Sequence, residues 1–159
     1  MLGIYHELLG VPMTANRNPC PLPVSISKAT LVENLSKTSY LITSKADGVR
    51  MTLLLCTHEG EWRSCFIDRK LETTDIPLAA AKSFFKGTIF DGELVKTAQG
   101  SIFLVFDIYA YKGSNECQMK CLYDRAEILR ICLSSDASDD IRMKSNNGFV
   151  VSLRSNLQI

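Results

Sequence analysis

The fold prediction starts from the motif Lys45-Ala46-Asp47-Gly48-Val49-Arg50. Apolar, β-prone runs flank it over residues 40–44 and 49–56, so the pattern predicts two strands joined by a tight turn. Gly48 is expected to let the backbone turn between them. The same Asp-Gly pair is also an ordinary hairpin signal, and on that interpretation Lys45 is a surface lysine without a chemical role.

A lysine in this position suits nucleophilic attack on a phosphate. An amine attacks only in its neutral form, and a neighbouring cation such as Arg50, together with partial burial, favours that form. The motif therefore makes Lys45 the candidate nucleophile, and residues further along the chain support this role.

The composition is that of an ordinary globular protein. The chain has 159 residues, of which 46% are hydrophobic and 22% charged, and this length is sufficient for one domain with its own core. Because the net charge is +1, composition predicts no strongly basic face and no tight electrostatic binding of nucleic acid. A nucleotide, or an RNA end held partly by another domain, is compatible with this charge.

Cysteine and histidine spacing does not predict a zinc site. The chain has six cysteines but no Cys-x-x-Cys pair, and Cys117 and Cys121 are four residues apart with no histidine near them in sequence. We expect scattered free thiols, which fit a reducing, intracellular compartment. We expect no membrane span, and residues 1–11 lack the basic leader of a signal peptide.

Hydrophobic periodicity predicts an α+β fold with mostly antiparallel sheets and flanking helices. Residues 1–22 are expected to form an irregular segment after a short helix over 3–9, and residues 23–159 to form one domain. Residues 102–106 are apolar on both faces, which favours a central strand. The further helices are predicted over residues 28–37, 75–85 and 122–133. The further strands are predicted over residues 62–67, 88–95, 101–110 and 148–153, with a turn at 59–61 and loops at 112–118 and 134–140.

Charged residues then recur within apolar strands. Asp91 and Glu93 are two apart in a predicted strand, so both are expected on one face, where paired carboxylates suit a magnesium ion and sugar hydroxyls. Asp107 interrupts the most apolar strand of the chain, and Arg69 follows another strand. Half-buried charges need partners, which here are each other, a metal or a ligand. The alternatives are a solvated hairpin edge for the carboxylates and a surface ion pair for Arg69.

The order of these clusters resembles the covalent nucleotidyltransferase superfamily, which comprises mRNA capping guanylyltransferases, ATP-dependent DNA ligases and RNA ligases. The chain is most similar to the guanylyltransferase domain of mRNA capping enzymes, over residues 23 to about 130. That resemblance implies a nucleotidyltransferase fold of the ATP-grasp-like, DNA ligase–capping enzyme type. The matching segments are the lysine motif, Pro23-Val24-Ser25-Ile26-Ser27, Ile67-Asp68-Arg69, Asp91-Gly92-Glu93-Leu94-Val95 and Phe106-Asp107-Ile108.

The resemblance implies a role for each candidate residue. Lys45 would attack the α-phosphate of GTP, forming a lysine–GMP intermediate and releasing pyrophosphate. Arg50 and Arg69 would contact the ribose or phosphates, and Glu93 the ribose hydroxyls or the metal. Phe106 would stack on the purine, with Phe103 as the less favoured candidate. The alternative for Phe106 is packing in the core of a central strand. The pocket-supporting residues would be Asp47, Gly48, Asp91 and Asp107.

The implied substrates are GTP, with Mg²⁺ or Mn²⁺ as cofactor, and the 5′-diphosphate end of an RNA. The family also has a later acidic-Gly strand, a Lys-x-Lys strand and an OB-fold domain, and none of these is found in this sequence. We therefore expect an incomplete C-terminus and partners that supply the missing domains. We also expect weak or no self-labelling by the chain alone, with recovery when the missing C-terminal half is supplied. The resemblance implies an intracellular location in the nucleus or cytoplasm, with a viral factory or virion as the alternative. The alternative functions are an ATP-dependent DNA or RNA ligase domain and a catalytically incomplete nucleotide-binding or interaction module.

Overall fold

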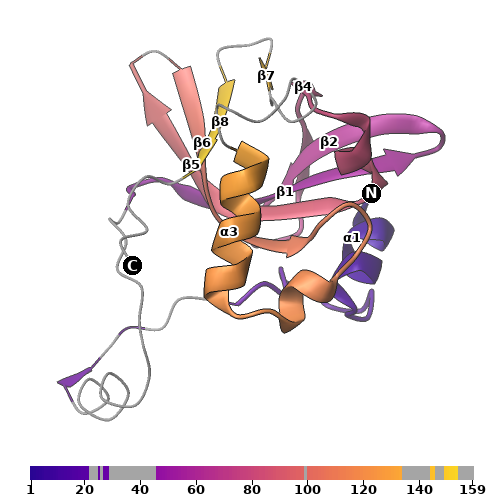
Figure 1. Cartoon of the computed structure of the whole chain (residues 1–159), viewed down its shortest axis with the longest axis horizontal. Helices are drawn as coiled ribbons and strands as arrows, with labels where there is room; N and C mark the ends of the chain where they lie inside the picture. Colours follow the sequence, from indigo (N-terminus) through magenta and orange to yellow (C-terminus); the bar gives the residue numbers. More distant parts are fainter. Residues whose placement is uncertain are drawn as a thin grey trace. The chain divides into compact units, whose positions relative to one another are not determined.

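The computed structural model describes residues 1–21, 25, 27–28, 46–98, 100–133, 144–145 and 149–153, and for the last two ranges it describes the backbone. Met1–Pro19 and Ala46–Arg154 form one compact unit, which contains all of the helices and strands named below (Figure 1). Cys20–Lys45 and Ser155–Ile159 form a second unit, of which only a few residues are described.

The helices and strands follow one another along the chain as in Figure 1. They are α1 (Leu2–Leu9), β1 (Val49–His58), β2 (Glu61–Ile67), β3 (Thr73–Asp75), β4 (Leu78–Ala79), the 3-10 helix η1 (Lys82–Lys86), β5 (Thr88–Thr97), β6 (Gly100–Ala110), the 3-10 helix η2 (Glu116–Met119), α3 (Leu122–Leu133), β7 (Lys144–Ser145) and β8 (Phe149–Leu153).

Most of the strands join in one sheet whose order, among the described residues, is β3-β2-β1-β5-β6-β8. Neighbouring strands are antiparallel except β6 and β8, which are parallel. β1, which begins inside the lysine motif, lies within this sheet: its Thr52 pairs with Ile67 of β2 on one side and with Asp91 of β5 on the other. The fold therefore places the exit of the lysine motif beside the strands that carry the other candidate residues.

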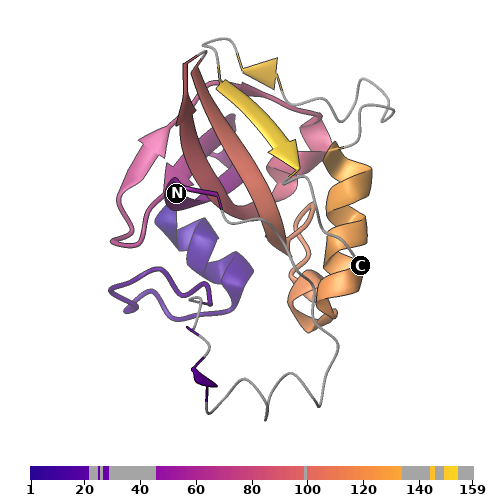
Figure 2. The same ribbon diagram turned by 90° about the vertical axis from the view of Figure 1, so that its left-hand side faces the viewer.

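Alternation along the strands gives the sheet two different faces. Leu53 and Leu55 belong to the hydrophobic core, together with Phe90, Phe103 and Leu129 of α3. We call the opposite side, which carries Arg50, Thr52, Asp91 and Glu93, the polar face. Figure 2 shows α3 and α1 on opposite sides of the strands, so α3 covers the core and α1 covers part of the polar face.

Buried contacts hold α1 against the polar face. Tyr5 is fully buried, and its hydroxyl lies 3.1 Å from the Thr52 hydroxyl. The Cys56 thiol lies 3.6 Å from the Met1 sulfur. α1 ends at Gly10, whose φ of 67° is the left-handed conformation that favours glycine at a helix C-terminus. None of the helices in the described part of the chain has the length and apolar character needed to span a bilayer.

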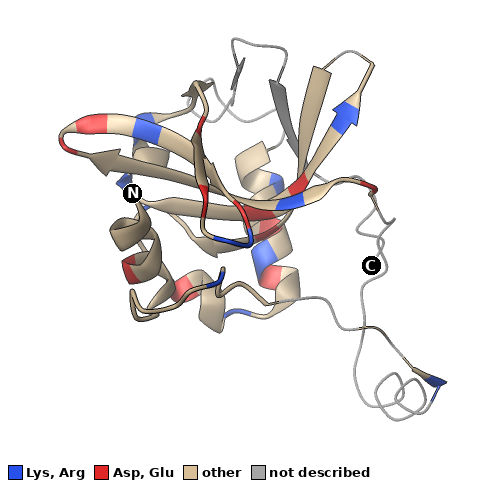
Figure 3. Ribbon diagram, turned by 180° about the vertical axis from the view of Figure 1, so that it is seen from behind, with Lys and Arg blue, Asp and Glu red and all other residues tan. Residues whose placement is uncertain are grey.

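Charges of both signs are interspersed along the described ribbons in Figure 3, as the net charge of +1 leads us to expect.

The structure confirms the predicted α+β class and most predicted elements in the described ranges. β1 and β2 contain the predicted strands, β5 and β6 form the predicted hairpin, and α3 has the predicted bounds. The short N-terminal helix and the C-terminal strand are also present, and β6 is paired on both sides. Apart from residue 28, the helix predicted over 28–37 lies outside the described residues, as do the strand predicted over 40–44 and the loop predicted over 134–140.

The prediction of one helix over residues 75–85 is wrong. This segment forms the end of β3, the short strand β4 and the 3-10 helix η1. Ile76 bonds with Ser64 of β2 through both of its backbone groups: its N–H donates to the Ser64 carbonyl at 2.9 Å, and its carbonyl accepts from Ser64 Oγ at 2.6 Å. Pro77 disfavours a helical conformation in the residue before it. Pairing with β2 therefore overrides the helix propensity of the alanines that follow.

Candidate active site

The Arg50 side chain is held on the polar face by Asp91 of the neighbouring strand. Arg50 Nε donates to Asp91 Oδ1 at 3.1 Å, and Arg50 Nη2 donates to Asp91 Oδ2 at 2.5 Å. The Asp91 side chain is fully buried, and that of Arg50 is 15% exposed. A two-point contact of this kind fixes the plane of the guanidinium group. The contact with the neighbouring strand therefore sets the orientation of Arg50.

Asp91 has a third donor. The Tyr109 hydroxyl of β6 donates to Asp91 Oδ2 at 3.0 Å. Burial raises the pKa of the Asp91 carboxyl, and the Arg50 guanidinium and the Tyr109 hydroxyl act against that rise. Both carboxylate oxygens are thus engaged by protein groups, which makes Asp91 a support for its neighbours.

Phe106 reaches Arg50 because β6 is irregular at this point. Asp91 pairs with Asp107, but Gly92 pairs with Val105, so Phe106 is the extra residue of a β-bulge. The guanidinium carbon of Arg50 lies 5.6 Å from the centroid of the Phe106 ring, within range of a cation–π interaction. The bulge thus brings side chains from β1 and β6 together, although β5 separates these strands.

Gly48 and Glu93 connect the lysine motif to β5. The Gly48 N–H donates to Glu93 Oε1 at 3.0 Å. Gly48 is not among the glycines with positive φ; instead, a Cβ at this position would lie 2.5 Å from the Leu94 carbonyl oxygen. The predicted reason for Gly48, a tight turn, is therefore replaced by a close approach of two backbones. The motif needs glycine here because β5 leaves no room for a side chain.

Replacing Gly48 with alanine is expected to displace the lysine motif. The added Cβ would meet the backbone of β5, which cannot rotate away as a side chain can, so the Gly48–Glu93 hydrogen bond would lengthen or break. We expect a loss of about 1–3 kcal/mol in unfolding free energy by urea denaturation. Gly3→Ala is the matched control, because its Cβ would meet only the Met13 side chain, at 3.8 Å or more. Equal stability of the two variants would contradict this explanation of Gly48.

Gly92 serves the other face of the same strand. A Cβ on Gly92 would lie 2.6 Å from both the Phe103 ring and the Leu104 carbonyl oxygen. Phe103 is fully buried and belongs to the hydrophobic core. The structure therefore places Phe103 beneath the strand, whereas Phe106 contacts Arg50.

Asp107 anchors helix α3. Its carboxylate accepts from Arg125 Nε at 2.6 Å and from Arg125 Nη2 at 3.0 Å, and it also accepts from the Ile108 N–H at 2.8 Å. The hydrogen bonds from Arg125 to Asp107 raise the pKa of that guanidinium. The charge that interrupts the apolar strand therefore has a structural partner that the sequence pattern did not identify.

The remaining predicted residues are distributed around this cluster. Arg69 is exposed in the turn after β2, and because Ile67 pairs with Thr52, this turn lies at the same end of the sheet as Arg50. Asp47 is exposed beside Gly48. Lys45 itself lies outside the described residues.

A divalent cation such as Mg²⁺ is held by oxygen ligands, carboxylates above all. Across the described ranges, no group of three or more His, Cys, Asp or Glu side chains is suited to hold a metal ion. The predicted pairing of Asp91 with Glu93 around one ion is not supported, because Arg50 and Tyr109 occupy the Asp91 oxygens. A magnesium ion held mainly by substrate phosphates and water needs only one or two carboxylates. Glu93, with Oε1 on Gly48, fits this second mode.

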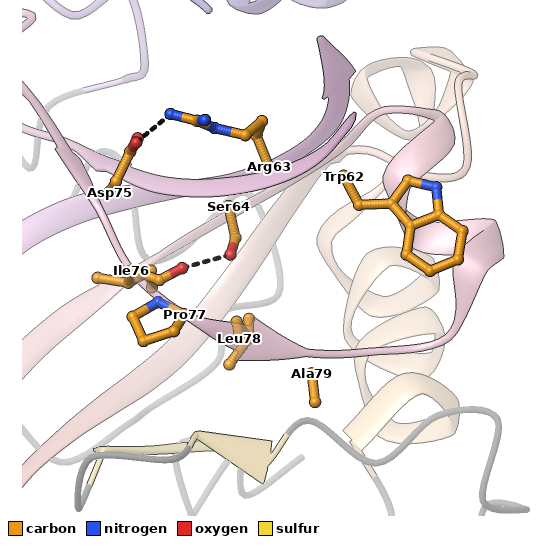
Figure 4. A pocket seen from close by; sticks show the side chains of 8 residues that line it. All are labelled: Trp62, Arg63, Ser64, Asp75, Ile76, Pro77, Leu78 and Ala79. Atoms are coloured by element: carbon orange, nitrogen blue, oxygen red, sulfur yellow. Dashed lines mark hydrogen bonds and ion pairs between the residues drawn. The ribbon is translucent and has the colours of Figure 1, made fainter. Parts of the chain in front are cut away.

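A separate pocket of about 490 Å³ lies beside Trp62, Arg63 and Ser64 in the first half of β2 (Figure 4). Trp62 of this pocket pairs with Thr57, whereas the candidate site is near Arg50 at the start of β1. Its lining contains none of the predicted site residues, so it is distinct from the candidate site. The pocket is lined by Trp62, Arg63, Ser64, Asp75, Ile76, Pro77, Leu78 and Ala79.

Comparison with known proteins agrees with this arrangement. The family described as mRNA capping enzyme, catalytic domain, matches residues 4–155. The chain therefore belongs to this family, which confirms the guanylyltransferase-like resemblance seen in the sequence. Among curated proteins, it is similar to the mRNA-capping enzyme subunit alpha of Neurospora crassa, with 34% identity over 123 residues. The match covers 67% of this chain but only 30% of the relative.

Proposed function

We propose that this chain carries the GTP-binding part of an mRNA guanylyltransferase, in which residues 23–159 form a partial nucleotidyltransferase domain. The observation that carries the proposal is the contact network at the exit of the lysine motif. Gly48 is tied to Glu93, and Arg50 is tied to Asp91 and lies over Phe106. These contacts connect three of the sequence clusters that characterise the family to which the chain belongs.

The proposed reaction is an in-line displacement at the α-phosphate of GTP. The neutral amine of Lys45 forms the nitrogen–phosphorus bond, the bond from the α-phosphorus to the bridging oxygen breaks, and pyrophosphate leaves. A 5′-diphosphate RNA end then attacks the same phosphorus and releases the lysine. Positioning and charge neutralisation supply most of the catalysis in such displacements.

The side chains of the site are assigned to parts of the nucleotide. Arg50 and Arg69 donate to the ribose or phosphates, for which the planar fork of donors in arginine is suited. Phe106 stacks on the purine from its position beside Arg50. Asp47, Gly48, Asp91 and Asp107 support the pocket. Asp91 orients Arg50 through the bidentate contact, so the orientation does not have to be created when GTP binds.

Glu93 is assigned to the metal or to the ribose hydroxyls. It would hold Mg²⁺, or Mn²⁺, together with the substrate phosphates, and the bound cation neutralises charge on the triphosphate. The hydrogen bond that Glu93 Oε1 accepts from the Gly48 N–H would keep the Glu93 carboxylate at a fixed place relative to the lysine motif.

The other proposed partners are an RNA 5′ end and further capping domains, including an OB-fold domain. Support for further domains comes from the Neurospora crassa relative, because the match spans only 30% of that protein. The proposed location is the nucleus or the cytoplasm, where RNA ends are capped.

The substrate experiment is incubation of the chain with radiolabelled GTP or ATP and magnesium, followed by denaturation. We expect an acid-labile adduct from GTP that is weak or absent with the chain alone and is recovered when the missing C-terminal half is supplied, and we expect 5′-diphosphate RNA to discharge it. An adduct from ATP alone would favour the ligase alternative. An intact nucleotide that binds without forming an adduct would favour the binding-module alternative.

A further inference from the structure

The side chain of Asn18 joins three segments of the compact unit. Its Oδ1 accepts from the Tyr5 hydroxyl of α1 at 2.9 Å, and its Nδ2 donates to Thr52 Oγ1 of β1 at 3.2 Å. The same Nδ2 also donates to the Asp68 carbonyl at 3.3 Å, in the turn after β2. Asn18 therefore connects the N-terminal segment to the sheet and to the turn that carries Arg69.

The contact with the sheet is made in a buried place. Tyr5 is 0% exposed and Thr52 is 1% exposed. Thr52 Oγ1 in turn donates to the Ile67 carbonyl at 3.2 Å, so the network reaches the last residue of β2. Thr52 is two residues from Arg50 and pairs with Asp91. The network thus adjoins the part of the polar face on which the candidate site is built.

The turn after β2 is fixed by its own contacts as well. Asp68 Oδ1 accepts from the Lys70 N–H at 2.8 Å and from the Glu72 N–H at 2.9 Å. Leu71 has a φ of 67°, a conformation that is unfavourable for a residue with a side chain. Such a turn needs support from outside if it is to keep one shape.

Asn18 supplies that support at consecutive residues. Besides the contact with the Asp68 carbonyl, the backbone N–H of Asn18 donates to the Arg69 carbonyl at 3.2 Å. The two hydrogen bonds hold the carbonyl groups of Asp68 and Arg69, which precede and follow the Arg69 N–H along the main chain. The Arg69 residue itself remains exposed. A contact made only to anchor the N-terminal segment would not need two carbonyls of the turn.

We infer that Asn18 is a positioning residue for Arg69, and that residues 1–18 are therefore part of the framework of the nucleotide site. The consequence for GTP rests on the proposed function, in which Arg69 contacts the nucleotide. The effect on the turn does not depend on that function.

The first experiment measures hydrogen exchange in the full chain. Asn18→Ala is expected to speed exchange of the Asp68, Lys70, Leu71 and Glu72 amides about fivefold, the change expected for loss of one ordinary hydrogen bond. Amides of the β5–β6 hairpin serve as the internal reference for global unfolding. Asn16→Ala is the matched control, since Asn16 is an exposed asparagine two residues away. Unchanged exchange in the turn, or equal acceleration in the hairpin, would overturn the positioning role.

The second experiment separates donor from acceptor. Asn18→Asp keeps an oxygen for Tyr5 but loses the Nδ2 donor to Asp68, so we expect it to speed exchange in the turn at least as much as Asn18→Ala. Protection of the turn at the level of the original chain would show that the donor is not what holds it, and would contradict the assignment.

The third experiment is a double-mutant cycle on GTP. Asn18→Ala is expected to raise the GTP concentration needed for half-maximal labelling about three- to thirtyfold, with little change in the maximal rate. In an Arg69→Ala background the same substitution should have almost no further effect, because its action passes through Arg69. Additive effects would refute the link to the nucleotide. If the original chain neither binds nor is labelled by GTP, the proposed function fails, while hydrogen exchange still decides the positioning role.

Discussion

Replacing Lys45 with alanine is expected to abolish labelling of the chain by GTP. The proposed reaction forms a covalent bond to the Lys45 amine, so without that amine there is no acceptor for GMP. Lys45→Arg should be equally inactive, because a guanidinium stays protonated and is not a nucleophile. The measurement is radiolabel retained on the denatured protein after incubation with labelled GTP and magnesium, and both variants are expected at background.

Lys96→Ala is the control for this experiment. Lys96 is an exposed lysine of β5, so its removal should leave labelling at the level of the original chain. GTP binding, followed separately by equilibrium dialysis, should fall far less than labelling in Lys45→Ala. Labelling of Lys45→Ala at the original level would exclude Lys45 as the nucleophile.

Replacing Asp91 with alanine is expected to cost about 3–5 kcal/mol in unfolding free energy. Asp91 is fully buried and receives hydrogen bonds from Arg50 and Tyr109. Removing one partner of a buried pair leaves the other charge without compensation, which costs more than the intact pair contributes. Urea denaturation measures the loss. Because Arg50 would also lose its orientation, GTP binding should weaken under conditions in which the variant is still folded.

Asp75→Ala is the matched control, since Asp75 also pairs with an arginine, Arg63, but in that pair the side chains are 57% and 41% exposed. Exposed ion pairs contribute about 0–1 kcal/mol, so we expect a change within that range. Similar losses in the two variants would mean that burial of the Arg50–Asp91 pair does not determine its importance.

The secondary structure that the sequence predicts correctly is the part in which local pattern and tertiary packing agree. β6 combines a long apolar run with neighbours on both sides, and α3 repeats apolar residues at helical spacing. Residues 75–85 have no such agreement. Their alanines favour a helix, but Ile76 is hydrogen-bonded to Ser64 across a gap of twelve residues, and this contact cannot be read from local propensity.

The candidate site could likewise be predicted from the sequence only in part. Charged and aromatic residue types within motifs indicate which residues belong to it, and the structure brings Arg50, Glu93 and Phe106 to one face. The supporting contacts could not be predicted, because they join residues distant in sequence. Examples are Tyr109 on Asp91 and Asn18 on the Arg69 turn. A polar Asn18 before a proline-rich stretch carries no sequence signal for that role. The bulge at Phe106 likewise depends on strand register, which the apolar run alone does not specify.

The most direct test of the central claim is to locate the covalent nucleotide. The chain is incubated with equal concentrations of GTP and ATP plus magnesium, digested under alkaline conditions that preserve a phosphoramidate, and analysed by mass spectrometry. The proposed function predicts GMP on the peptide that contains Lys45, fragmented to that residue, and no AMP. AMP on Lys45, or a nucleotide attached to a different residue, would contradict it.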